Sequence, residues 1–160
     1  MTISVGDKVP SASVWNKNAE GIDKIDFAEF CAGKTVAFFA VPGAFTPTCQ
    51  EQHFPSYKEN AQKLRDKGVD IIACMSVNDP FVMKAWGDLL DPEGDIMMLA
   101  DGLGELAEGV GLTIDASGVG LGQRAARFSM LIKDGVVASL HVEDAGAYEA
   151  SAAEVLLEDL

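Results

Sequence analysis

Hydrophobic positions predict buried strands separated by helices in the first half of the chain. Residues 36–41 are apolar throughout and are bounded by glycine and proline, which is typical of a strand buried on both faces. Residues 69–77, apolar except for Asp70 and Ser76, predict a second buried strand. Between them, residues 47–67 have helical character that ends at Gly68, while Pro55 should kink or interrupt the helix. This order predicts neighbouring parallel strands joined by a right-handed crossover.

The second half of the chain combines helices with an antiparallel hairpin. Apolar spacing predicts, in chain order, a helix at 80–90, a strand at 96–99, a helix at 103–110 and strands at 128–133 and 136–142. Asp134 and Gly135 form a strong hairpin signal between the last two strands. Ser151 and Glu154 have the spacing of a capping box before a final helix. The predicted fold class is α/β: a thioredoxin-like mixed sheet with helices on both faces.

Composition predicts one domain over residues 1–160 and no membrane span. The chain has 160 residues, of which 48% are hydrophobic, but it has no long uncharged apolar run of the kind that crosses a bilayer. Residues 1–10 lack the apolar stretch of a signal peptide. The three cysteines are widely spaced and form no zinc pattern, so we expect no metal and a reducing, cytoplasmic location.

The charge balance excludes some partners. With 12 basic and 25 acidic residues, the chain carries a formal net charge of −13. Binding to nucleic acid needs clustered Lys and Arg, and anionic lipid attracts the same residues, so neither partner is expected. An arginine in so acidic a chain is a better candidate for a defined task, and Arg127, which precedes an apolar strand, is such a residue.

The clearest chemical signal follows the first buried strand. Thr46 suits the N-cap of a helix, and Pro47 suits its first position. Thr48 and Cys49 then occupy the next positions, where backbone N–H groups have no carbonyl to bind. Because these donors and the helix dipole favour anions, Cys49 should be biased toward the thiolate, which is the reactive form of cysteine. Cys31 and Cys74 have no such context, and most free cysteines are simply buried apolar residues.

The segment Pro42-Gly43-Ala44-Phe45-Thr46-Pro47-Thr48-Cys49 resembles the active-site signature of peroxiredoxins, Pro-x-x-x-Thr-x-x-Cys. In its full form it is similar to the type II, peroxiredoxin-V-like subfamily, whose members pair with glutaredoxin or thioredoxin. Further matches run in the same order to nearly the end of the chain. They are His53 and Tyr57 in Cys-x-x-x-His-x-Pro-x-Tyr, Val77-Asn78-Asp79-Pro80-Phe81-Val82, Ala85-Trp86 and Arg127-Phe128-Ser129-Met130.

The resemblance implies a thiol-specific peroxidase with no cofactor. Cys49 would attack hydrogen peroxide or an organic hydroperoxide and become a sulfenic acid. Thr46, the amides of Thr48 and Cys49, and Arg127 would hold the developing anionic oxygen. The resemblance also places Arg127 beside the thiolate. A cation is needed there because the helix end alone falls short of fully ionising the Cys49 thiol, and the forked donors of arginine suit anionic oxygens. Pro42 would shield the sulfur from water, although its position would also simply end a strand.

The thiol that resolves the sulfenic acid is left open by the sequence. No cysteine follows Cys74, so the C-terminal resolving cysteine of some relatives is missing. Cys74 has a spacing from Cys49 like that of plant-type members, but it lies within a predicted buried strand, which favours a structural role. Cys31 is expected to pack within a helix. The preferred interpretation is turnover on one cysteine with glutathione or glutaredoxin; the alternative reductant is thioredoxin.

Two further residues receive supporting roles. His53 lies four residues after Cys49 and shares its helical face, but a thiolate needs no base, so we expect a structural or hydrogen-bonding role. Arg124 also matches a position of the family and is assigned a supporting or interface role. The resemblance further implies a homodimer rather than a ring of dimers. Its candidate interface residues are Phe45 and Pro80-Phe81, apolar groups expected on loops at the carboxyl edge of the sheet. The alternative is that Phe45 packs within its own subunit.

Two rival functions remain for comparison. A disulfide oxidoreductase of the same fold would need Cys-x-x-Cys, but Gln52 occupies the second cysteine's place. A redox sensor or holdase, oxidised once and not recycled, would share the reactive cysteine. Sustained peroxide consumption with a recycling thiol distinguishes the peroxidase from the sensor.

Overall fold

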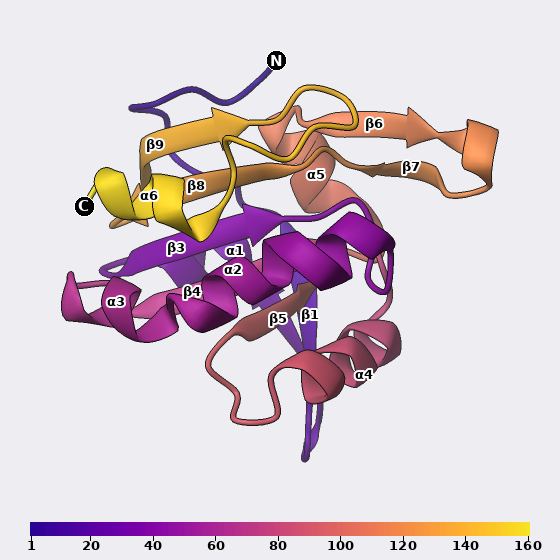
Figure 1. The fold of residues 1–160 in the computed structure, drawn as a ribbon, viewed down its shortest axis with the longest axis horizontal. Coiled ribbons are helices and arrows are strands. Elements are labelled where there is room, and N and C mark those ends of the chain that lie inside the picture. Colours follow the sequence, from indigo (N-terminus) through magenta and orange to yellow (C-terminus); the bar gives the residue numbers. More distant parts are fainter.

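A seven-stranded mixed β-sheet forms the centre of the fold (Figure 1). The computed structural model describes residues 1–160. Its strands are β1 Ser13–Asn18, β2 Gly21–Asp26, β3 Thr35–Ala40, β4 Ile71–Ser76, β5 Met97–Ala100, β6 Thr113–Ala116, β7 Gly122–Ala125, β8 Phe128–Lys133 and β9 Val136–Val142. The order in the sheet is β2-β1-β5-β4-β3-β8-β9, and β6 pairs separately with β7. β3, β4 and β5 are parallel neighbours, whereas the other pairs are antiparallel.

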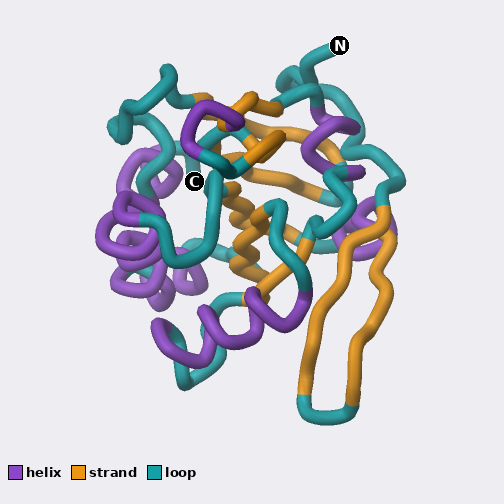
Figure 2. Tube along the Cα trace, turned by 90° about the vertical axis from the view of Figure 1, so that its right-hand side faces the viewer, coloured by secondary structure: helices purple, strands orange, loops and turns teal.

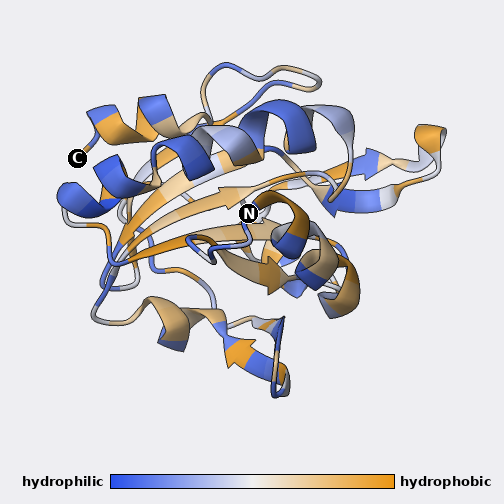
Figure 3. Cartoon of the chain, turned by 60° about the horizontal axis from the view of Figure 1, so that its bottom comes forward, coloured by the Kyte–Doolittle hydropathy of each residue, from blue (hydrophilic) through white to orange (hydrophobic).

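Helices cover both faces of the sheet, as predicted for a thioredoxin-like fold. They are α1 Phe27–Cys31, α2 Phe54–Glu59, α3 Ala61–Asp66, α4 Pro80–Leu90, α5 Glu105–Val110 and α6 Ala153–Glu158. Helices α1 and α5 bury apolar side chains in one core, and α2, α3, α4 and α6 bury theirs in a second core. Alternate residues of β3 point into the two cores, with Phe38 in the first and Phe39 in the second. Figure 3 shows the same pattern, with apolar strands inside and hydrophilic outer sides on the helices.

Several predicted elements are confirmed within a few residues. The parallel strands β3 and β4, the helices α4 and α5, and the β8–β9 hairpin all lie where apolar spacing placed them. Asp134 and Gly135 both have positive φ, 48° and 76°, as the tight hairpin turn requires. The helix in which Cys31 was expected to pack is present as α1, whereas the β6–β7 pair and the β1–β2 hairpin, which extends as a long arm in Figure 2, were not predicted.

The helical segment after β3 is divided differently from the prediction. A π-helical turn, Cys49–His53, comes first, followed directly by α2, and Asn60 separates α2 from α3. Pro55 follows the π turn within continuous helical backbone, since His53 has helical φ and ψ of −66° and −55°. The irregular π turn therefore precedes Pro55, and the second break occurs five residues after it.

The predicted capping box before α6 is wrong. The helix begins at Ala153 with Ala152 as its N-cap and without a side-chain cap. The Ser151 hydroxyl instead donates to Glu143 Oε2 at 2.7 Å, and Glu154 Oε1 accepts from Asn60 Nδ2 at 3.2 Å. Tertiary partners have thus replaced the local bonds that the spacing suggested.

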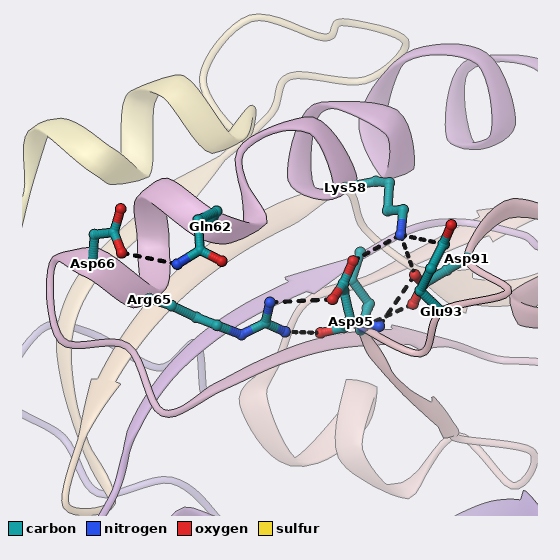
Figure 4. A network of polar contacts seen from close by, with 8 residues as sticks. Lys58, Gln62, Arg65, Asp66, Asp91, Glu93 and Asp95 are labelled. Carbon is teal, nitrogen blue, oxygen red and sulfur yellow. Dashed lines mark hydrogen bonds and ion pairs between the residues drawn. The ribbon is translucent and has the colours of Figure 1, made fainter.

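A charged network ties α2 to the loop before β5 (Figure 4). The Lys58 ammonium lies 2.7 Å from Asp91 Oδ1, 2.6 Å from Glu93 Oε2 and 2.7 Å from Asp95 Oδ2. Arg65 adds a bond from Nη2 to the Asp95 backbone carbonyl at 2.7 Å. These three carboxylates have the spacing of metal ligands, but the lysine already supplies the positive charge among them.

None of the helices has the length and apolar character needed to cross a bilayer.

Candidate active site

Strand pairing brings Arg127 to the turn that carries Cys49. Strand β3 runs antiparallel to β8, with Ala40 opposite Phe128. Arg127, one residue before β8, therefore arrives beside the chain as it leaves β3. The π turn begins at Cys49, at this same end of the sheet. Residues separated by 78 positions in the sequence thus meet at the end of one buried strand.

The guanidinium of Arg127 contacts the Cys49 sulfur directly. Its Nη2 donates to Cys49 Sγ at 3.1 Å, and its Nη1 lies 3.0 Å from Nδ1 of His53. Cys49 is fully buried, whereas Arg127 is partly exposed. A permanent cation at this distance stabilises the anionic form of the sulfur. Of the predicted site residues, the structure places Arg127 and Cys49 in direct contact.

The His53 imidazole is neutral and holds Arg127 from behind. It is fully buried, and its Nε2 lies 3.1 Å from the backbone carbonyl oxygen of Ser151. Because that carbonyl can only accept, the network assigns the proton to Nε2 and leaves the Nδ1 lone pair to accept from Arg127. Burial, reinforced by the charge of Arg127, lowers the pKa of His53 to about 3. The hydrogen-bonding role expected for His53 therefore has a defined partner.

The loop before Cys49 is held by polar bonds from two directions. The Ala44 amide donates to Asn78 Oδ1 at 3.0 Å, which anchors the loop to the residues after β4. The Thr46 hydroxyl donates to the Gly43 carbonyl at 2.6 Å. Thr46 stands just before the helix as predicted, and its carbonyl accepts from the Gln50 amide at 2.9 Å, but no helix amide donates to its hydroxyl. Its oxygen lone pairs remain able to accept a hydrogen bond.

The amides of Thr48 and Cys49 have no acceptor within the protein. This agrees with their predicted place among the unpaired donors at a helix start. Pro42 is half-buried, and Arg124 Nη1 lies 3.5 Å from its carbonyl oxygen. Arg124 Nε also donates to the Leu121 carbonyl at 2.9 Å. Arg124 therefore supports the loop and does not contact Cys49.

The segment after β9 encloses the site and was missed by sequence reasoning. The Glu143 amide donates to the Arg127 carbonyl at 3.0 Å. Its carboxylate accepts from the amides of Glu149 and Ser151, both at 2.8 Å. Tyr148 donates from its hydroxyl to the Gln52 carbonyl at 3.2 Å. These are mostly contacts to backbone groups, for which the residue types carry little signal, and the false capping box hid the role of Ser151.

The other two cysteines are buried and unpaired. Cys74 lies in β4 between Phe39 of β3 and Met98 of β5, within the same core as Cys49. Burial, and to a lesser degree the neighbouring Cys49, raises the pKa of the Cys74 thiol well above its ordinary value. Cys31 lies in the opposite core, where burial raises its pKa to about 12. Neither thiol is a ready nucleophile, because only the thiolate attacks.

Comparison with known proteins gives the class of this fold and site. The family model described as Redoxin matches residues 4–156. The chain therefore belongs to the redoxin family, whose model spans nearly all of the sheet and the cysteine-bearing turn.

The most similar relatives narrow the class to peroxiredoxins of the type 2 group. The chain is 46% identical to "Peroxiredoxin-2E-2, chloroplastic" of Oryza sativa subsp. japonica, over 99% of this chain and 73% of that protein. It is 42% identical to "Peroxiredoxin-2B" of Arabidopsis thaliana, covering 99% and 98% of the two chains. The structure of reduced Prx3 from Vibrio vulnificus in complex with hydrogen peroxide has a TM-score of 0.94 at 45% identity, covering 98% of both chains. This protein is a peroxiredoxin, a thiol-dependent peroxidase.

Proposed function

We propose that Cys49 is the peroxidatic cysteine and that Arg127, Thr46 and two backbone amides stabilise its reaction. The contact from Arg127 Nη2 to Cys49 Sγ at 3.1 Å carries this proposal. The thiolate attacks one peroxide oxygen, so an S–O bond forms as the O–O bond breaks. Cys49 is oxidised to a sulfenic acid, and the departing oxygen takes up a proton to leave as water or an alcohol.

Each neighbouring group has a separate task in that step. Arg127 and the unpaired amides of Thr48 and Cys49 stabilise the negative charge that develops on the departing oxygen. The Thr46 hydroxyl, which already donates to Gly43, accepts a hydrogen bond from the peroxide O–H. Pro42 lines a cavity together with Thr48 and Arg127, and on that side it covers the site.

A separate thiol, from glutathione or glutaredoxin, is proposed to restore Cys49, with thioredoxin as the alternative. Burial and protonation of Cys74 and Cys31 support a turnover that uses no second cysteine of this chain. Three unpaired cysteines also fit a reducing compartment such as the cytoplasm. We further propose that residues 1–160 act as one domain, since the two cores share the strands of one sheet.

A Cys31→Ser, Cys74→Ser double variant should keep most of the activity of the parent. The measurement is steady-state peroxide consumption with glutathione alone, glutathione plus glutaredoxin, or thioredoxin with its reductase. We expect sustained turnover of both proteins with glutaredoxin. A redox sensor would instead consume one equivalent of peroxide and stop.

Mass spectrometry after one equivalent of peroxide provides the control for this prediction. Singly oxidised or glutathione-bound Cys49 is the expected product. A disulfide between Cys49 and Cys74, together with loss of turnover in the double variant, would overturn one-cysteine turnover. If only thioredoxin supported turnover, thioredoxin would take the place of glutathione or glutaredoxin as the proposed reductant, and the role of Cys49 would be unaffected.

His53 is proposed to position Arg127, which two variants test. His53→Leu removes the acceptor for Arg127 Nη1, so we expect kcat/KM for peroxide to fall about 10- to 100-fold, because small misplacements of a reacting group are costly. His53→Asn keeps an acceptor near the place of Nδ1 and should retain most activity. The thiolate absorbance of Cys49, followed against pH, should move to higher pH in His53→Leu only.

The comparison separates positioning from a structural role. Both variants lose the bond to the Ser151 carbonyl, which still accepts from the Tyr57 hydroxyl at 2.9 Å, so both should lose some thermal stability. Equal activity in the two variants, or equal losses without a shift in the titration, would contradict the positioning role.

We propose that the chain forms a homodimer through loops beside the active site. Phe45 and Phe81 are 47% and 62% exposed. Phe45 also has φ of +67°, an uncommon conformation for a bulky residue. The alternative is that Phe45 packs within its own subunit. Its ring does approach Trp86, with 6.4 Å between the ring centroids, but nearly half of the residue stays exposed. Large apolar side chains that a subunit leaves exposed favour an interface.

Sedimentation of the reduced protein at micromolar concentration should give the mass of a dimer. A Phe45→Ser, Phe81→Ser variant should shift this equilibrium toward monomer. Leu89→Ser is the matched control, because Leu89 is also exposed but lies at the far end of α4. A monomer or a decamer of the parent protein would overturn the proposal without affecting the chemistry of Cys49.

A further inference from the structure

A cavity of about 380 Å³ opens beside the reactive sulfur. Thr48, which precedes Cys49 in sequence, and Arg127, which contacts its sulfur, form the part of the lining nearest Cys49, and Pro42 belongs to the same lining. The residues from Glu143 to Ala147, after β9, form the opposite part. The cavity reaches the Arg127 guanidinium, which contacts the Cys49 sulfur, so it offers an incoming peroxide a path to that buried residue.

The cavity lining is dominated by negative charge. Asp115, Glu143 and Asp144 contribute three carboxylates, whereas Arg127 is the one cation. Hydrogen bonds from Ser117 lower the pKa of Asp115. Burial opposes ionisation of Glu143, but hydrogen bonds from Ser151 and its neighbours outweigh it and lower the pKa of its carboxyl. These two groups are therefore ionised at neutral pH.

The single cation does not offset this charge for an incoming molecule. Both terminal nitrogens of Arg127 are already engaged, one with Cys49 Sγ and the other with His53. Against the single positive charge of Arg127, the three carboxylates leave the cavity lining with an excess of negative charge. The chain as a whole carries a formal net charge of −13, which adds a long-range repulsion of any anion.

We propose that this cavity selects uncharged hydroperoxides and discriminates against peroxides that carry a negative charge. The inference rests on the proposed reaction of Cys49 and adds the charge of its substrate class. A carboxylate-bearing hydroperoxide that enters the cavity approaches three like charges. At low salt, each of these charges should slow its reaction with the protein about two- to threefold. The combined discrimination is on the order of tenfold and falls as salt screens the charges.

A matched pair of substrates tests the charge alone. The probes are cumene hydroperoxide carrying a para-carboxylate or a para-carboxamide, which are nearly equal in size and in O–O chemistry. Stopped-flow fluorescence gives the second-order rate constant for oxidation of reduced protein by each probe. At low ionic strength we expect the carboxamide to react about tenfold faster. The ratio should approach one at about 1 M salt, where the screening length is about 3 Å.

Two protein variants locate the effect. Asp115→Asn with Asp144→Asn should lower the carboxamide-to-carboxylate ratio severalfold. Asp66→Asn with Asp88→Asn removes the same net charge from exposed sites on α3 and α4 and should leave the ratio close to that of the parent. Glu143 is left unchanged because its bonds to Ser151 shape the loop.

The outcomes distinguish this inference from the proposed function. A ratio near one at low salt, or equal changes in the two double variants, would overturn charge selection while leaving the peroxidase intact. A parent protein that neither probe oxidises at Cys49 would instead refute the proposed reaction, and the inference with it.

Discussion

Cys49→Ser should abolish peroxide reduction while leaving the fold intact. A serine hydroxyl is not ionised at neutral pH, so the variant lacks the nucleophile that attacks the O–O bond. The side chain is buried, but the new hydroxyl can accept from Arg127 Nη2, which now contacts the sulfur at 3.1 Å. An unsatisfied buried hydroxyl costs about 1–3 kcal/mol of stability, so this partner should keep the loss small.

The measurements are peroxide consumption with an excess of thiol reductant and thermal unfolding followed by circular dichroism. Cys74→Ser is the matched control, since it makes the same substitution at another fully buried cysteine of the same core. It should retain turnover. Activity of Cys49→Ser above a few per cent of the parent, with a normal unfolding curve, would remove Cys49 from the mechanism.

Arg127→Ala should lower the rate of peroxide reduction by about 10² to 10³, the usual cost of removing one donor that stabilises a transition-state oxyanion. The substitution also removes the cation beside the sulfur. The thiolate absorbance should therefore appear at higher pH than in the parent, because less positive charge stabilises the anion. His53 would lose the group that Nδ1 accepts from, but its bond to the Ser151 carbonyl is unaffected.

Arg127→Lys separates charge from geometry. One ammonium carries the same charge but lacks the planar fork that reaches both Cys49 and His53. We expect its thiolate titration to lie between those of the parent and Arg127→Ala, with a rate well below that of the parent. Arg65→Ala, whose parent residue pairs with Asp95, is the control and should keep full activity. An unchanged rate together with an unchanged titration in Arg127→Ala would refute the role of Arg127.

The parts of the fold that were predicted correctly are those in which the local pattern and the burial agree. Strands β3 and β4 are buried on both faces and are continuous apolar runs, which no exposed segment imitates. The β8–β9 hairpin was predicted because its turn requires the positive φ that Asp134 and Gly135 tolerate.

The parts that were missed or wrong depend on distant partners. Strand β2 lies at the sheet edge with charged, exposed residues, so no apolar pattern marks it. The capping box is absent because both of its members bond elsewhere: Ser151 bonds Glu143, and Glu154 bonds Asn60 at the junction of α2 and α3. Local propensity was overridden by these tertiary hydrogen bonds.

The candidate for the reactive cysteine came from the sequence itself. A buried strand, a proline at a helix start and unpaired backbone amides are local features, and together they single out Cys49 as the candidate nucleophile. The same reasoning identified Arg127 only as a cation with a defined task. The resemblance indicated that its partner is Cys49.

Only the tertiary structure decided how that cysteine is held. Antiparallel pairing of β3 with β8 brings Arg127 across 78 residues to the sulfur, and the carbonyl of Ser151, 98 residues from His53, sets the tautomer that orients it. The negative cavity likewise joins residues after β9 to Asp115 of β6. Such contacts depend on strand register and chain crossing, which a one-dimensional pattern of residue types does not encode.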